Sequence, residues 1–140
     1  MANLVYNRGK FLLASGVNMG TADLRMLLVN ASYAANADHN SVADVVGNEI
    51  SVSGYSRQQV ANKTITEDDT NDVVFLDADD VTFNSLVTGQ TVGGAVLYRH
   101  NASDSAAEVI CFYDLTDTPT NGGDIQVQFA AAPNGVLKLA

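Results

Sequence analysis

Hydrophobic and polar residues alternate with a period of two over much of the chain after residue 48. The clearest case is "DIQVQFA" (124–130), where Ile125, Val127 and Phe129 would face the core and the residues between them would face solvent. The segment "AEVICFYDL" (107–115) is instead apolar on both faces, which is typical of a central strand. Comparable patterns predict further strands at 48–55, 59–68, 72–78, 80–83, 91–100 and 135–140.

The segment before residue 48 has a different pattern, with two short helices and one strand. Residues 7–15, "NRGKFLLAS", predict a helix that stops at Gly16, a residue suited to the left-handed position after a helix. Residues 23–30, "DLRMLLVN", predict a buried strand. Ser41 and Asp44 have capping-box spacing and predict a second helix that ends at Gly47.

About eight short strands separated by turns predict one mainly β domain over residues 1–140. We expect an antiparallel β-sandwich, jelly-roll-like, with one or two short helices near the N-terminus. In 59–68 the alternation would place Val60, Asn62, Thr64 and Thr66 on one face. Gly93-Gly94 precedes an apolar run and predicts a bulge or close packing of the backbone.

Composition supports this fold and narrows the possible partners. Hydrophobic residues make up 46 % of the chain, enough for a core, and 17 Val against 12 Leu favours strands. The net charge is −9, and no Lys or Arg occurs between Thr64 and Tyr98. Because nucleic acids and anionic membranes attract basic surfaces, we expect neither as a partner.

The N-terminal segment and the cysteine content lead to two further expectations. The N-terminal sequence "MANLVYNRGKFLLASG" has no apolar run of the length that a signal peptide or membrane span requires. Cys111 is the single cysteine, so neither an intrachain disulfide nor a cysteine zinc cluster is expected. Its apolar surroundings predict a small buried side chain rather than a nucleophile.

The most conspicuous candidate chemistry is an acidic segment. Seven carboxylates lie between Glu67 and Asp80, but their spacing does not match an EF-hand loop. We expect Glu67–Asp72 and Asp77–Asp80 to be solvated turns and no metal or other cofactor to be bound. A calcium site assembled from Asp77, Asp79 and Asp80, or a catalytic carboxylate among them, remains an alternative.

Other enzymatic signatures do not occur in the sequence. His39 and His100 lie in polar segments without the spacing of a metal site, and surface loops are expected for both. There is no Gly-x-Ser-x-Gly elbow, phosphate-binding glycine loop or Cys-x-x-Cys pair. We therefore expect no catalytic residues and a protein that is not an enzyme.

The order of these segments resembles that of a family of small structural proteins of tailed bacteriophages, the capsid decoration (cement) or minor tail proteins. The resemblance covers nearly the whole chain, from "NLVYNRGKFLLASG" to "NGVLKL". Its most specific parts are Gly-Tyr-x-Arg at Gly54–Arg57 and "FLDADDVTF" at 75–83, followed by "GAVLY". Phe83 is a departure, because members of the family often carry Trp at that position.

The resemblance implies a virion protein without chemistry of its own. A decoration protein assembles in the bacterial host cytoplasm, binds the outer face of the head and bridges subunits of the major capsid protein to stabilise the shell. It implies a homo-oligomer, expected to be a trimer, with contacts through the Ser/Thr/Asn-rich loops and the segment before Gly16. The alternative is a tail or fibre component, including a glycan- or receptor-binding module.

Overall fold

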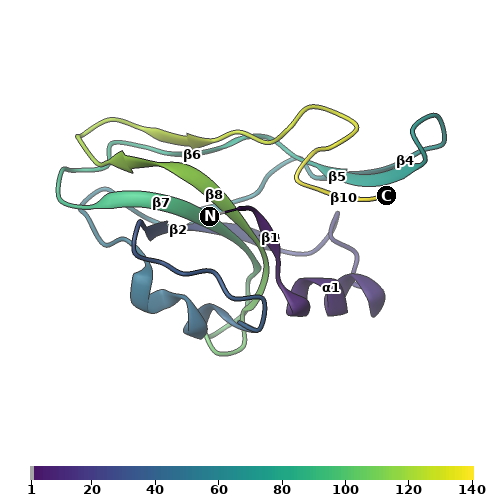
Figure 1. Ribbon diagram of the computed structural model, residues 1–140, viewed down its shortest axis with the longest axis horizontal. Coiled ribbons are helices and arrows are strands. Elements are labelled where there is room, and N and C mark those ends of the chain that lie inside the picture. The colour runs from purple at the N-terminus through teal and green to yellow at the C-terminus, as the bar shows by residue number, and fades with distance from the viewer. Residues whose placement is uncertain (1) are drawn as a thin grey trace.

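The computed structural model describes residues 2–140 and shows a mainly β protein (Figure 1). Strands hold 40 % of the residues and helices 10 %, and every strand pair is antiparallel, which confirms the predicted class. The finer expectation of a jelly roll stays a prediction. Within the described residues, no helix has the length and apolar character needed to cross a membrane.

The largest sheet has five strands in the order β1-β8-β7-β2-β3. Its long members, β7 and β8, were predicted from their apolar runs, and β8 continues four residues past the predicted end at residue 115. The strands are β1 (Leu4–Val5), β8 (Glu108–Pro119), β7 (Thr91–Arg99), β2 (Leu24–Asn30) and β3 (Gln58–Gln59).

Two smaller sheets complete the strand arrangement. The ladder of β6 (Val81–Phe83) and β9 (Ile125–Val127) lies beside the large sheet. The other sheet, in the order β10-β5-β4, joins Leu137–Leu139, Val73–Asp77 and Thr64–Asp68. It extends toward one end of the molecule, above α1, with the β4–β5 turn at its tip (Figure 1). We call this three-stranded sheet and its β4–β5 turn the arm.

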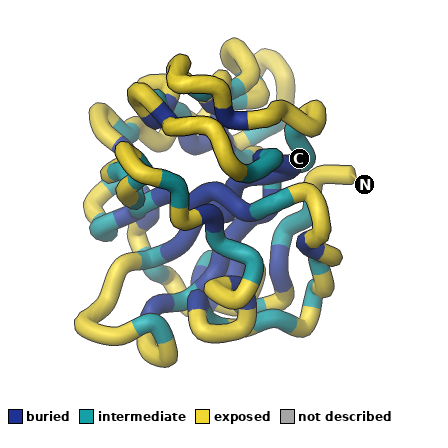
Figure 2. Tube along the Cα trace, turned by 90° about the vertical axis from the view of Figure 1, so that its left-hand side faces the viewer, coloured by how far each residue is buried: buried dark blue, intermediate teal, exposed yellow. Residues whose placement is uncertain are grey.

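The five-stranded sheet is buried on both faces, and Figure 2 shows the buried chain in the interior with exposed loops around it. On one face, Met26, Leu28 and Leu97 pack with Phe83 and Val127 of the β6–β9 ladder. On the other face, Leu27, Val29, Val96 and Tyr98 pack with Tyr33, Val42 and Val45 of the segment 31–48. A layer therefore covers each face, which gives the sandwich-like arrangement.

The two helix predictions have different outcomes. The predicted helix at 7–15 is confirmed as α1, which spans Asn7–Ala14 and ends one residue earlier than predicted. Gly16 has φ +87°, and Gly9 lets the helix lie against the backbone of Ile110 in β8. The second predicted helix is instead two 3₁₀ turns, η1 (Val42–Asp44) and η2 (Val46–Asn48). The capping-box residues are correct, since the Asp44 carboxylate accepts the backbone N–H of Ser41 at 3.0 Å.

Two strand predictions are wrong in part. Residues 49–57 form an irregular segment, held to β2 by the N–H of Ile50, which donates to the Leu28 carbonyl at 3.1 Å. The predicted strand 59–68 is broken at Asn62, which has φ +54°. Gln58–Gln59 therefore joins the large sheet and Thr64–Asp68 the arm, so the four predicted positions do not share one face.

The alternation in 124–130 is confirmed, but its strand is shorter than predicted. β9 ends at Val127, and Phe129 is half-buried with its ring 5.9 Å from that of Tyr113, edge to face. The backbone N–H of Phe129 donates to the Asp80 carboxylate at 2.9 Å instead of to a neighbouring strand. Full burial of Phe129 was therefore the wrong expectation.

The prediction for Gly93-Gly94 is confirmed. A bulge lies between Val92 and Gly94 in the ladder of β7 with β8. A Cβ on Gly94 would overlap the Phe112 ring and lie 2.9 Å from the Tyr113 carbonyl oxygen. The absence of a side chain at Gly94 thus lets the Phe112 ring pack directly on the backbone of β7.

Gly94→Ala is expected to destabilise the fold by about 1–3 kcal/mol, because the added methyl group must displace a buried ring. Gly47→Ala is the matched control, since Gly47 is exposed and a Cβ there meets no atom within 4 Å. Urea unfolding monitored by circular dichroism measures both. Equal losses for the two variants would show that the contact with Phe112 does not limit this position.

Candidate functional site

The most elaborate polar cluster is built around Arg57, the last residue of the Gly-Tyr-x-Arg segment. Gly54 lies so close to the Ser85 carbonyl that a Cβ would overlap that oxygen, which fixes the turn before Tyr55. After the turn, β3 pairs Gln58 with Met26 of β2. Arg57 is therefore held beside the edge of the large sheet, where its side chain reaches two other segments.

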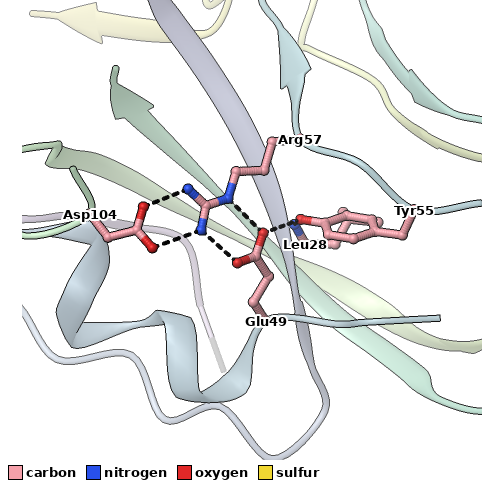
Figure 3. A network of polar contacts seen from close by, with 5 residues as sticks. All are labelled: Leu28, Glu49, Tyr55, Arg57 and Asp104. Atoms are coloured by element: carbon pink, nitrogen blue, oxygen red, sulfur yellow. Dashed lines mark hydrogen bonds and ion pairs between the residues drawn. The ribbon is translucent and has the colours of Figure 1, made fainter. Parts of the chain in front are cut away.

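The Arg57 guanidinium lies between two carboxylates (Figure 3). Its Nε and Nη2 donate to Oε1 and Oε2 of Glu49, at 2.8 Å and 2.7 Å. Its Nη1 and Nη2 donate to Oδ1 and Oδ2 of Asp104, at 2.7 Å and 3.2 Å. Such paired N–H···O contacts match the planar shapes of the guanidinium and carboxylate groups.

Tyr55 extends this network into the sheet. Its hydroxyl donates to Oε1 of Glu49 at 2.7 Å and accepts the backbone N–H of Leu28 at 3.1 Å (Figure 3). The ring of Tyr55 stacks on Phe83, with centroids 5.9 Å apart. One side chain thus connects the core, the β2 backbone and the ion pair.

The contacts of the cluster shift the pKa values of Asp104, Arg57 and Tyr55 away from neutral pH. Hydrogen bonds from Arg57 lower the pKa of Asp104, and hydrogen bonds to Glu49 and Asp104 raise the pKa of Arg57. Burial, together with the nearby Glu49 carboxylate, raises the pKa of Tyr55. The guanidinium also lies 5.6 Å from the centre of the Tyr98 ring, in cation–π range.

This arrangement favours a structural role for the cluster. Each of the three guanidinium nitrogens donates to a carboxylate, and the Tyr55 hydroxyl both donates and accepts. General acid or base catalysis needs a group placed to exchange a proton with a substrate. Here the donors and acceptors face one another, and they join residues 49–57 to β2 and to the loop at Asp104.

The acidic turns are shorter than predicted, because Glu67 and Asp68 end β4 and Asp77 ends β5, and carboxylates of both segments accept local hydrogen bonds. Asp77 accepts from the N–H of Ala78 at 2.9 Å, Asp79 from the Asn62 amide at 2.6 Å, and Asp80 from the N–H of Phe129. At the end of β4, Asp68 accepts from the N–H groups of Thr70 and Asn71 in the β4–β5 turn. In residues 2–140, no three His, Cys, Asp or Glu side chains form a group that could hold a metal ion.

The remaining candidate residues are separated in the fold. His100 is exposed, whereas His39 is half-buried, with Nδ1 2.9 Å from the Tyr33 hydroxyl, so only His100 is a plain surface residue. Cys111 is buried as predicted, and burial raises the pKa of its thiol to about 12. It lies on β8 beside Val5 of β1, in the register of that ladder.

Sequence reasoning singled out Arg57 as part of a motif but missed its partners. Glu49 was assigned to a strand and Asp104 to no element, and 47 positions separate Arg57 from Asp104. Comparisons with protein-family models, curated proteins and solved structures found no match for this chain.

Arg57→Leu is expected to destabilise the fold by about 2–4 kcal/mol, because it leaves the Glu49 and Asp104 carboxylates without their cation. Arg57→Lys keeps the charge but not the paired N–H groups and is expected to lose less. Arg25→Leu is the matched control, since the pair of Arg25 with Asp23 is more exposed and is expected to contribute at most about 1 kcal/mol. Chemical unfolding of the three variants ranks them, and an Arg25→Leu loss as large as that of Arg57→Leu would contradict the structural role.

Asp104→Asn is expected to make stability less dependent on pH. Because the folded state lowers the pKa of Asp104, its contribution is present above the unfolded value of about 3.9 and is lost as pH falls through the folded pKa. The difference between the wild type and Asp104→Asn should therefore be largest near neutral pH and shrink at acidic pH. Urea midpoints over that range test this, and a difference that stays constant with pH would refute it.

Proposed function

We propose that this chain is a structural protein of a tailed-phage virion, a decoration (cement) protein that binds the outer face of the head. In this role it bridges subunits of the major capsid protein and stabilises the shell, and it assembles in the bacterial cytoplasm. The resemblance of its segments to that family supports the proposal. The net charge of −9 also supports it, because an acidic protein is repelled by packaged DNA and suits the outside of the shell.

The observation that carries the proposal is the apolar surface of the arm. Ile65 is 50 % exposed and Leu139 is 54 % exposed, and Val74 between them is also exposed. Exposed apolar residues gathered in one place mark surfaces that contact another macromolecule. A decoration protein functions through contacts of this kind, which act together when one molecule meets several subunits.

The polar clusters support the same conclusion. The Arg57 network and the turns at Asp77–Asp80 use their hydrogen-bonding groups within the protein. They favour a role in which the fold presents a surface over one in which a side chain reacts. We therefore propose a non-enzymatic, adhesive function.

A glycan-binding tail or fibre module is the alternative, and the aromatic residues give it less support. Tyr6, Tyr33 and Tyr98 are buried, as are Phe83 and Phe112. Phe11, on α1, is the large aromatic side chain that is exposed among residues 2–140. A sugar-stacking platform would therefore rest on this one ring.

The test is reconstitution with heads that lack the protein. Purified protein added to such shells is expected to saturate at a copy number fixed by the capsid lattice and to raise their disruption temperature. A cyclic trimer is the expected oligomer, because its symmetry matches a threefold point of the shell. Copy number follows from quantitative mass spectrometry of washed shells. Binding to tails but not to shells would overturn the decoration role in favour of the tail alternative.

A further inference from the structure

The register of the arm places two rows of side chains on one face. Ile65 of β4, Leu76 of β5 and Leu137 of β10 are paired across the ladders and form the inner row. Glu67, Val74 and Leu139 are paired in the same way and form the outer row. Residues paired across antiparallel strands lie on the same face of a sheet. This face is therefore apolar except for Glu67 at the edge strand.

The apolar rows line one wall of a groove. Leu13 of α1 and Val17 and Met19 of the following loop form the opposite wall, and the groove has a volume of about 180 Å³. Ile65 leans toward that loop, with its Cδ1 3.5 Å from the place where a Cβ of Gly20 would lie. Leu76 is buried at the base, whereas Ile65 and Leu139 remain exposed at the rim. The groove is thus open to an aliphatic side chain from outside.

The groove continues into an acidic hollow at the tip of the arm. The hollow also measures about 180 Å³, and it shares Val74 and Leu139 with the apolar groove. Its other lining residues are Val73 and four carboxylates, Glu67 and Asp68 at the end of β4 and Asp69 and Asp72 in the β4–β5 turn. The surface therefore changes from apolar to anionic along one continuous path.

The one cation of the arm, Lys138 on β10, forms no ion pair with these carboxylates. Residues 64–98 contain no Lys or Arg, and Lys138 on β10 donates to Asn134. Among residues 2–140, the ion pairs involve none of the four carboxylates of the hollow. A partner that covers the groove and places a cation over the tip would match both the shape and the charge of this path.

We propose that the arm groove binds a segment of a different chain in which aliphatic side chains are followed by Lys or Arg. A second copy of this protein is a poor occupant, because two acidic tips would repel each other. Its four arginines already form ion pairs, with Glu108, Asp23, Glu49 and Asp104, and its three lysines are spread over α1, the chain before β4 and β10. The groove chemistry is inferred from the arm alone; that the partner is a shell subunit rests on the proposed function.

Shell binding by matched variants tests the position of the contact. Ile65→Glu and Val87→Glu place a charge at two side chains that are each 50 % exposed, one on the arm and one outside it. Ile65→Glu is expected to weaken binding to shells at least about tenfold and Val87→Glu to leave it unchanged. Thermal melts show that each variant is folded. If wild-type protein binds shells and Ile65→Glu binds equally well, the arm is not the contact surface.

A second pair of variants tests whether binding requires the negative charge at the tip of the arm. The double substitution Glu67→Lys with Asp69→Lys reverses the tip, whereas Asp117→Lys changes an exposed carboxylate of β8 outside the arm. The tip variant is expected to bind shells at least about tenfold more weakly than Asp117→Lys, and the wild-type affinity should fall as salt rises. Equal binding by the two variants would overturn the acidic half of the proposal.

A peptide assay tests the groove without shells. Because the protein has no Trp, a peptide with alternating leucines, two following lysines and one Trp reports binding by fluorescence anisotropy without background. Saturable binding is expected, and it should be lost when glutamates replace the lysines, when serines replace the leucines, or in Ile65→Glu.

The shell-binding and peptide assays together distinguish the groove proposal from the proposed decoration role. No saturable signal up to about 1 mM peptide, or equal binding of the glutamate peptide, would overturn the groove proposal. So would concentration-dependent self-association of the wild type that Ile65→Glu abolishes. If the protein binds the peptide but does not bind shells, the groove proposal is supported and the decoration role is refuted.

Discussion

Burial of β7 on both faces is the constraint on which the rest of the fold depends. Seven of its nine residues, from Val92 to Tyr98, are buried. Other segments of the protein must therefore cover both faces of the sheet. The β6–β9 ladder covers one face, and the irregular segment 31–48 contributes to the cover of the other. An irregular cover brings backbone polar groups close to a core, where each needs a hydrogen-bond partner. In the segment 31–48, the buried residues Tyr33, Val42 and Val45 donate their N–H groups to backbone carbonyls, those of Asn30, Ala107 and Val42.

Arg57 helps to hold a second irregular segment, residues 49–57, at the edge of the large sheet. Residues 49–57 have one regular backbone contact to β2 at Ile50, and the side-chain network adds the Tyr55 hydroxyl and the two carboxylates. Taking a guanidinium and a carboxylate out of water is unfavourable, so the net stabilisation from the intact cluster is modest. Its larger effect is geometric, because the bidentate contacts fix the position of an otherwise irregular segment.

The sequence was informative where one physical signal dominated. The alternation in β9 and the apolar runs of β7 and β8 predicted strands correctly, because burial on a sheet requires those patterns. In 48–55 a similar alternation was misleading, since Ile50 is buried from an irregular segment. Asn62 broke another predicted strand because Asn tolerates the left-handed region, which a polar–apolar pattern does not reveal.

The candidate site was less predictable than the fold for a different reason. A single sequence gives no sign that Asp104 lies beside Arg57, because their contact depends on how the β7–β8 connection folds back. The groove of the arm could not be predicted for the same reason, because it brings residues near 13–19 together with residues near 65 and 139. Each strand of the arm was expected, but their assembly into a separate sheet is a property of topology.

The burial of Cys111 makes this side chain a natural probe of local opening. The thiolate is the reactive form of cysteine, and a pKa of about 12 leaves almost none of it in the closed protein. A thiol reagent can therefore modify Cys111 readily only when the chain around it opens, at β1 or at the segment 134–138, or when the whole domain unfolds. The free energy of opening obtained from that reaction rate, compared with the free energy of global unfolding, would reveal whether the chain around Cys111 opens as a unit of its own.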